Sequence, residues 1–296
     1  MIFNPRRLYI SIIGAGRVGT TLARMLQRSG VKIDAVVSRN KRSAFALGRL
    51  VSCDNCSNAV SVIPSSTNLI VIAVPDQSIR GVAQSLSVLS HLHFRKLAVC
   101  HTSGALTSDV LQRVARKGAR VFSLHPVQTF PKRKSLHGQI VSMKNVTYGV
   151  EGKARALPLA FSLVRRLGGK PLLVPKEAKI LYHLVCVIAS NYSVALIGAV
   201  EEMSRTFTRK GLSPFRKLIE TSVGNALESG AVYSLTGPIV RGDEKVVASH
   251  LRSLKDPELR ALYRSLGMYT LRLASRKRAL SSRQTLSLRK LLEGKG

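Results

Sequence analysis

Short apolar runs alternate with stretches of helical spacing through the first half of the chain. The helical stretches include Thr20–Gly30 and Ala154–Leu167. Apolar runs that are continuous rather than alternating are typical of strands buried on both faces, as in a parallel sheet. The pattern therefore predicts a doubly wound α/β fold with a mostly parallel sheet. The predicted strands are Tyr9–Ile13, Ile33–Val37, Leu69–Val74, Leu97–Cys100, Arg120–Leu124, Val146–Val150 and Lys170–Val174.

The strand pattern stops at Pro175, and only helical patterns follow it. A chain of 296 residues is long enough for two ordinary domains. We therefore predict an α/β domain over 1–175 and an all-helical domain over 176–296. The helical patterns run over 177–207, 213–230, 243–254 and, with interruptions, 257–292.

The segment Ile180–Val200 contains no Lys, Arg, Asp or Glu, and it is long enough to cross a membrane. It also holds polar residues such as Tyr182, His183 and Asn191, which are costly in lipid. The sequence therefore favours a soluble protein in which this helix is buried against the α/β domain and a second copy of the chain. We expect a homodimer formed through the helical domain, and no membrane partner.

A glycine motif follows the first predicted strand and opens the first helix. The run Gly14-Ala15-Gly16-Arg17-Val18-Gly19 has the spacing G-x-G-x-x-G in the context that dinucleotide binding requires. Gly14 would form the tight turn, Gly16 would let the backbone approach a pyrophosphate, and Gly19 would let the helix pack closely on the strand. The positive end of the helix, at Arg17 and Val18, would hold phosphate.

The end of the second strand indicates which dinucleotide is bound. NAD enzymes usually place Asp or Glu there for the ribose 2′-hydroxyl. This chain instead has Ser38 and Arg39, a hydroxyl and a planar cation that suit a 2′-phosphate. The sequence therefore predicts NADP as the cofactor.

Three more strands end in polar or backbone-bending residues. Ligands of open α/β sheets bind outside the carboxyl ends of the strands, so these residues should face one crevice. We assign the cofactor to Val74, Pro75, Asp76 and Ser103, and proton transfer to His125. His101 is a further candidate. A structural histidine whose ring nitrogens are hydrogen-bonded inside the protein would have the same sequence pattern.

The helix after the boundary adds two polar candidates. His183 and Asn191 are eight residues apart and lie near one helix face. Polar groups on an apolar helix either satisfy one another and the backbone or face a ligand. In the second case His183 would be the proton donor, Asn191 would hold a substrate oxygen, and the His183 ring would lie within about 10 Å of the strand ends.

Composition adds one unusual feature, a net charge of +32. The excess is spread evenly, with +17 over 1–150 and +15 over 151–296, and there is no Trp. Nucleic acid is therefore not the expected partner, despite the charge. Cys53 and Cys56 have C-x-x-C spacing without a second pair, so we predict no metal site. The apolar run Leu8–Ile13 is too short for a signal peptide, which favours the cytoplasm.

Three motifs together resemble a known family. They are the run SLHPVQTFP at 123–131, Tyr182-His183 with Ser190-Asn191-Tyr192, and LTGPIVRGD at 235–243 followed by His250-Leu251. They resemble the bacterial family that pairs a Rossmann-like domain with a C-terminal domain of unknown function 2520. More distantly, the layout is similar to 6-phosphogluconate dehydrogenase and pyrroline-5-carboxylate reductase relatives, which implies an NADP domain followed by a helical substrate and dimerisation domain.

The distant dehydrogenases carry a Lys and an Asn one turn apart on their central helix. The comparable face of this chain offers His183 and Asn191, two turns apart, with Lys179 one turn before His183. The resemblance therefore implies the same layout but a different set of proton-transfer groups.

Two classes of function fit the residues. In the first, the chain is an NADP-dependent oxidoreductase that transfers a hydride to or from a small carbonyl or imine substrate bound between the domains, and a histidine moves the proton. In the second, it is a non-catalytic NADP-binding sensor or scaffold. Turnover of NADPH distinguishes the two, and a steep salt dependence of affinity would identify a nucleic-acid binder.

Overall fold

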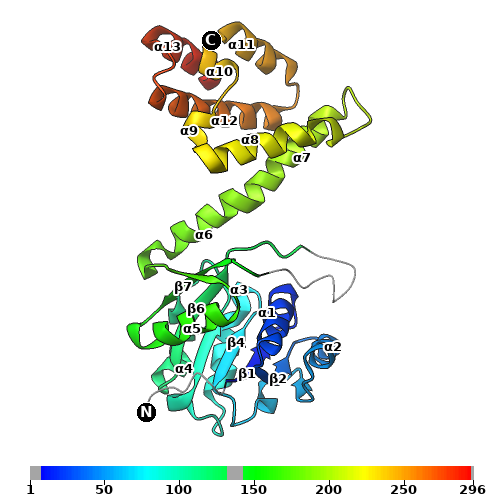
Figure 1. The fold of residues 1–296 in the computed structure, drawn as a ribbon, viewed down its shortest axis with the longest axis vertical. Helices are drawn as coiled ribbons and strands as arrows, with labels where there is room; N and C mark the ends of the chain where they lie inside the picture. The colour runs from blue at the N-terminus through cyan, green and yellow to red at the C-terminus, as the bar shows by residue number, and fades with distance from the viewer. Residues whose placement is uncertain (1–7, 132–142, 295–296) are drawn as a thin grey trace. The chain divides into compact units, whose positions relative to one another are not determined.

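The computed structural model describes residues 8–131 and 143–294, and its first part is built around one eight-stranded sheet (Figure 1). The strand order is β3-β2-β1-β4-β5-β6-β7-β8, and among the described strands only the β6–β7 pair is antiparallel. The predicted doubly wound, mostly parallel sheet is confirmed. The strands are β1 Tyr9–Ile13, β2 Lys32–Val37, β3 Cys56–Ser57, β4 Leu69–Ile72, β5 Ala98–His101, β6 Arg120–Pro126, β7 Thr147–Gly152 and β8 Lys170–Leu173.

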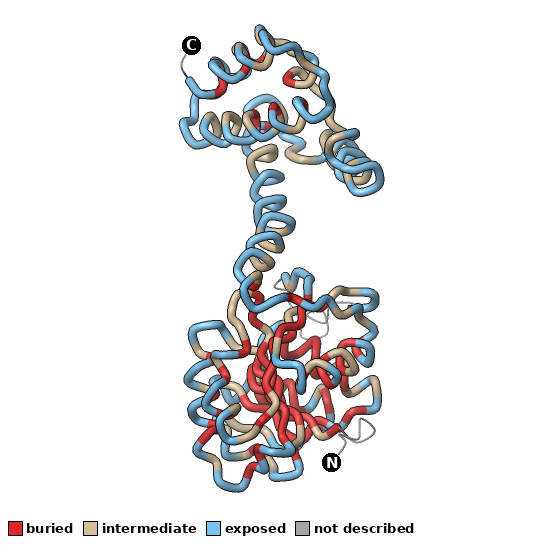
Figure 2. The backbone as a smooth tube through the Cα atoms, turned by 90° about the vertical axis from the view of Figure 1, so that its left-hand side faces the viewer, coloured by how far each residue is buried: buried red, intermediate tan, exposed pale blue. Residues whose placement is uncertain are grey.

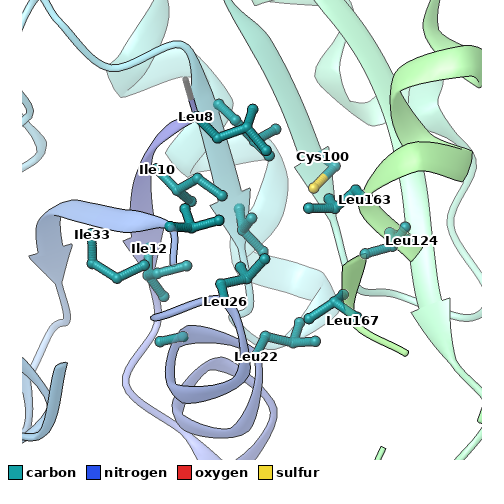
Figure 3. Packing of buried hydrophobic residues seen from close by; sticks show 14 of the residues in the cluster. Leu8, Ile10, Ile12, Leu22, Leu26, Ile33, Cys100, Leu124, Leu163 and Leu167 are labelled. Atoms are coloured by element: carbon teal, nitrogen blue, oxygen red, sulfur yellow. The ribbon is translucent and has the colours of Figure 1, made fainter. Parts of the chain in front are cut away.

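Helices cover both faces of this sheet. One face packs against α1 (Arg17–Arg28), α2 (Lys41–Val51) and α5 (Leu157–Arg166), which form a single buried cluster with the strands. Figure 3 shows Leu22 and Leu26, one turn apart on α1, packed beside Ile10 and Ile12 of β1. The other face packs against α3 (Asp76–Ser87) and α4 (Gln112–Arg116) through a second cluster.

Burial on both faces explains why the strands are apolar without alternation. Every residue of β4 is buried, as are the last four of β1 and the last five of β2. Figure 2 shows the buried backbone gathered along the strands. The sheet core is therefore a rigid platform for the loops at the carboxyl ends of the strands.

Among the described residues after β8, the regular elements are all helical, as the sequence predicts. A small core of their own, including Ile239, Val247 and Leu288, holds the last of them together. These helices are α6 Lys179–Val187, α7 Ser193–Ser204, α8 Arg216–Ser229, α9 Ala231–Ser234, α10 Pro238–Arg241, α11 Glu244–Ser253, α12 Pro257–Arg276 and α13 Ser282–Glu293.

Helices α6 and α7 are joined by one π-helical turn, Ile188–Tyr192. The chain divides into two compact units at the end of this turn, 1–192 and 193–296. Helix α6 therefore belongs with the sheet in the first unit. The change from α/β to all-helical structure does come just after Leu173, and the domain boundary near 175 stays a prediction.

The apolar helical segment is exposed, which differs from the expected burial. Ile180 is 68% exposed, Leu181 62% and Val194 67%. The expectation that packing against the α/β domain covers this segment is therefore wrong for α6 in the single chain. The stretch Lys176–Ser204 is long and apolar enough to cross a membrane, and none of its apolar window is buried. Exposed apolar faces of this kind often mark interaction sites.

Candidate functional site

The glycine motif forms a tight turn between β1 and α1. The Gly14 N–H donates to the Val37 carbonyl at 2.7 Å, and Gly14 has φ +110°, a value that side chains rarely adopt. A Cβ at Gly14 would collide with the Ala73 carbonyl, and a Cβ at Gly19 would collide with the Gly14 carbonyl. Both glycines are therefore required by the protein's own packing, in the roles that the motif predicts.

Gly16 is different, because it opens onto free space. A Cβ there would meet no atom within 4 Å, and its φ of −80° suits any residue. Gly16 is the N-cap of α1, and no side chain caps the first turn of that helix. Unused N–H groups at a helix N-terminus favour an anion. Unlike Gly14 and Gly19, Gly16 is therefore not required by the packing of the described residues.

A cavity of about 970 Å³ lies over the glycine turn. Six of the predicted cofactor residues line it, from the ends of β1, β2 and β4: Gly14, Gly16, Ser38, Arg39, Val74 and Pro75. No carboxylate is among its described lining residues, and the Arg39 guanidinium is its only charged side chain. The predicted residues are thus brought together around a space suited to a negatively charged ligand.

Sequence reasoning missed two parts of this lining. The segment Asn58–Ser61 follows β3, a two-residue strand too short to give a sequence pattern. One face of α3 contributes Ser78, Gly81 and Ser85. The small residues spaced by three or four along α3 were the available signal for this face.

The other predicted cofactor residues lie close by but do not line the cavity. Arg17 is exposed on the first turn of α1, and Val18 packs against the core beneath the turn. Ser103 donates its hydroxyl to the Asp76 carboxylate at 2.7 Å and accepts the Leu106 N–H at 2.9 Å. This pair fixes the loop after β5 to the first turn of α3.

His101 is held inside the protein. Its Nδ1 accepts the Ser103 N–H, and its Nε2 lies 3.2 Å from the Thr107 carbonyl. Burial, opposed in part by the Thr107 contact, lowers the pKa of His101 to about 4. His101 is therefore a neutral structural histidine that shapes the loop before Thr107.

A second, smaller cavity gathers the predicted catalytic residues. Its volume is about 280 Å³, and His125, His183 and Asn191 all line it. His125 comes from the end of β6, His183 from α6 and Asn191 from the π-helical turn, all within the first compact unit. The His125 and His183 ring centroids are 6.1 Å apart, within the expected limit. Single π-helical turns are frequent at functional sites.

Two glycines allow the rings of this cluster to approach. A Cβ at Gly104 would lie 2.5 Å from His183 Cδ2 and 2.9 Å from His125 Nε2. A Cβ at Gly149 would collide with the Tyr182 hydroxyl. Sequence reasoning missed both glycines, because their role exists only once β7, α6 and the loop after β5 come together.

Two further residues of α6 belong to this cluster, Tyr182 in contact with His125 and Lys179 near the Tyr182 ring. The Tyr182 hydroxyl is 2.7 Å from His125 Nδ1. Lys179 is almost wholly buried, its Nζ lies 5.3 Å from the centre of the Tyr182 ring, and it has no hydrogen-bond partner within the described residues. Burial lowers the pKa of Lys179 to about 8, against the opposing attraction of Glu151.

The electrostatics of the cluster favour a neutral His125. Burial, and then the positive charge of Lys179, lower the pKa of His125 to about 4. Burial raises the pKa of Tyr182 far above its usual value, so its hydroxyl keeps its proton at neutral pH. The sequence spacing already places Lys179 one turn before His183, and the structure adds that Lys179 is buried.

The cysteine pair near β3 is not arranged as a metal site. The Cys56 thiol lies 3.3 Å from the Cys53 carbonyl. Burial raises the pKa of Cys53 to about 11 and raises that of Cys56 as well. Over residues 8–131 and 143–294, no group of three or more potential metal ligands was found.

Two family models match the chain, one in each part. The model of a Rossmann-like domain family matches residues 2–126, and the model of the domain of unknown function DUF2520 matches residues 146–270. These are the two parts that the sequence motifs resemble. No curated protein sequence matches the chain.

Several solved structures share the whole fold. A Bacteroides fragilis protein provisionally described as an NADP oxidoreductase is 22% identical with a TM-score of 0.74, covering 89% of this chain and 98% of its own. A Thermotoga maritima protein is 25% identical with a TM-score of 0.69, covering 91% and 99%. A reductive aminase from Aspergillus terreus, solved with NADPH and ethyl-5-oxohexanoate, is 14% identical with a TM-score of 0.59, covering 97% and 93%.

Proposed function

We propose that this chain, which pairs a Rossmann-like domain with DUF2520, is an NADP-dependent oxidoreductase acting on a small carbonyl or imine substrate. The observation that carries the proposal is the open position at Gly16, at the base of a cavity of about 970 Å³ without a carboxylate. A glycine there lets another group approach the backbone closely, where a side chain would obstruct it. A pyrophosphate at the N-terminus of α1 is that group.

Two groups of residues that line the cavity fit two parts of NADP. The N–H groups at the start of α1 would bind the pyrophosphate, while Ser38 and Arg39 would bind the 2′-phosphate of the adenosine ribose. Asn40 follows them as the N-cap of α2 and accepts the Ser43 N–H at 3.3 Å, which fixes the backbone beside Arg39. When bound, the nicotinamide supplies the hydride chemistry that side chains lack.

The smaller cavity supplies the proton chemistry. His183 would donate or accept the proton, His125 is the second candidate, and Asn191 would hold the substrate oxygen. A volume of about 280 Å³ fits a small molecule. Lys179 keeps the region electropositive and, together with burial, keeps His125 neutral.

Structural neighbours support the proposal at the level of the fold. The Bacteroides protein is provisionally described as an NADP oxidoreductase, and the Aspergillus enzyme was solved with NADPH. The competing function, an NADP-binding sensor or scaffold, shares the large cavity but has no use for paired histidines. We therefore favour the enzyme.

A second copy of the chain is the partner that best accounts for the exposed apolar face of α6. Polar groups on that helix would be costly in lipid, and His183 also lines the smaller cavity. We propose a homodimer of a cytoplasmic protein, without a membrane or nucleic-acid partner. Sedimentation at micromolar concentration should give a dimer in detergent-free buffer, and a monodisperse monomer would contradict the proposal.

The function is tested by binding first and turnover second. Fluorescence titration should give tighter binding of NADPH than of NADH, because only NADPH carries the 2′-phosphate. NADPH oxidation is then followed with a panel of small ketones, aldehydes and preformed cyclic imines. Tight NADPH binding without oxidation across the panel would favour the sensor, and equal affinity for the two dinucleotides would contradict the assignment of Ser38 and Arg39.

A further inference from the structure

Tyr182 and His125 form a hydrogen-bonded pair between α6 and the end of β6. The hydroxyl lies 2.7 Å from Nδ1, and the two rings meet edge to face at 89°. On the other side of the ring, the His125 Nε2 atom lies 2.9 Å from the place that a Gly104 Cβ would occupy. The His125 side chain lines the smaller cavity together with His183. Among the described residues, Nε2 has no hydrogen-bond partner.

The Tyr182 hydroxyl has two possible acceptors for its proton, His125 Nδ1 at 2.7 Å and the Cys186 sulfur, and the imidazole nitrogen is the stronger acceptor of the two. Burial raises the pKa of the phenol, so the hydroxyl remains a donor, while the Gly149 backbone group bonds to it and lowers the pKa by a smaller amount. The hydroxyl oxygen thus accepts from Gly149, and its proton goes to His125 Nδ1. A neutral imidazole that accepts at Nδ1 carries its single proton on Nε2.

We propose that His125 presents a neutral Nε2–H donor to the smaller cavity, that Tyr182 is the positioning residue that fixes this tautomer, and that the substrate group bound there is a carbonyl oxygen. This rests on the proposed function and selects between its two substrate classes. A carbonyl oxygen has lone pairs to accept the Nε2–H. The nitrogen of a neutral imine has a lone pair too, but the protonated imine, which is the form that readily accepts a hydride, is a donor without one.

The two histidines then have different tasks. His125 binds and polarises the carbonyl oxygen without giving up its proton, as neutral histidines can do in other enzymes. His183 donates the proton that the oxygen gains when hydride arrives at the carbonyl carbon. The step balances, since one hydride and one proton convert the carbonyl to an alcohol.

A tautomer can be measured without any substrate. Nitrogen-15 NMR of the histidines in the full chain at pH 7 should give the Nε2–H form for His125 in the wild type. Tyr182→Phe removes the hydroxyl and should convert His125 to a mixture of tautomers. An Nδ1–H or doubly protonated His125 in the wild type, or an unchanged tautomer in the variant, would overturn the proposal.

The chain contains a matched control for this measurement. His250 Nδ1 lies 2.9 Å from the Tyr263 hydroxyl, with the rings at 89°, in the second compact unit. Tyr263→Phe should alter the His250 signals and leave those of His125 unchanged. If Tyr263→Phe also changed the His125 signals, the effect of Tyr182→Phe would be explained by destabilisation of the whole fold, and the proposal would be overturned.

Turnover tests the substrate class. With NADPH we expect oxidation driven by cyclohexanone and not by 1-pyrroline, a cyclic imine, and a fall in kcat/KM of about 10-fold for Tyr182→Phe. His125→Gln places an amide N–H near Nε2 without needing Tyr182, so Tyr182→Phe should add no further loss in that background. Turnover of 1-pyrroline in preference to the ketone would overturn the carbonyl assignment. Turnover of neither would refute the proposed function and its substrate class, while the NMR result would still decide the tautomer.

Discussion

A substitution at Gly16 should weaken cofactor binding with little effect on the stability of the fold. A Cβ at this position meets no protein atom within 4 Å, and φ is −80°. Gly16→Ala should therefore change the free energy of unfolding by less than about 1 kcal/mol, the usual scale of an N-cap substitution. The same methyl group would lie where the pyrophosphate approaches the backbone.

The expected loss of binding follows from the hydrogen bonds at stake. Each charge-assisted bond between a backbone N–H and a phosphate contributes about 1.5–3 kcal/mol. Losing two of them weakens NADPH binding by about 3–6 kcal/mol, which is a factor of about 10²–10⁴ in Kd. Gly16→Val, with a larger side chain in the same space, should abolish detectable binding.

Calorimetric titration with NADPH, together with thermal unfolding, measures both quantities. Gly14→Ala and Gly19→Ala should lower the unfolding temperature, because each new Cβ collides with a backbone carbonyl. Gly224→Ala, on α8 and also in open space, should leave NADPH binding unchanged. Wild-type affinity in Gly16→Ala and Gly16→Val would refute the placement of the pyrophosphate.

Three further substitutions test other parts of the site. Arg39→Asp should weaken NADPH binding by about 1.5–3 kcal/mol while sparing NADH, whereas Arg42→Asp, outside the cavity, should do neither in the same titrations. His101 has a folded pKa of about 4, below its unfolded value, so the unfolded chain binds the extra proton. The contribution of His101 to stability should fall by up to about 3 kcal/mol as the pH drops from about 6.5 to about 4. In urea titrations at each pH, His101→Asn should remove this part of the slope and leave the part due to His125. His183→Ala should leave NADPH affinity nearly unchanged and lower turnover by about 10²–10⁴-fold; lost stability with full activity per folded molecule would instead make His183 structural.

The sequence predicts the sheet and the glycine turn well because both depend on local patterns. Runs such as Leu69–Ile72 are apolar throughout since they are buried on both faces. Two of the three motif glycines, Gly14 and Gly19, lie where a side chain would collide with the backbone. The strand β3 could not be predicted, because two residues carry no periodicity. The family resemblance had already indicated the helical second part.

The candidate site is predicted less completely, because many of its contacts form only between elements that are distant in sequence. His125, His183 and Asn191 could be chosen as polar residues at strand ends or on an apolar helix. The Tyr182–His125 hydrogen bond and the role of Gly104 depend on β6, α6 and a loop meeting in space. The exposure of α6 was also missed, since an apolar segment has the same pattern whether its own chain or a second copy covers it.

The most direct test of the account is a crystal structure of the full chain with NADP⁺. We predict the pyrophosphate against Gly16 at the N-terminus of α1, the 2′-phosphate within hydrogen-bond distance of Ser38 or Arg39, and the nicotinamide directed toward His125 and His183. A dinucleotide bound elsewhere, or one whose nicotinamide points away from both histidines, would contradict the account.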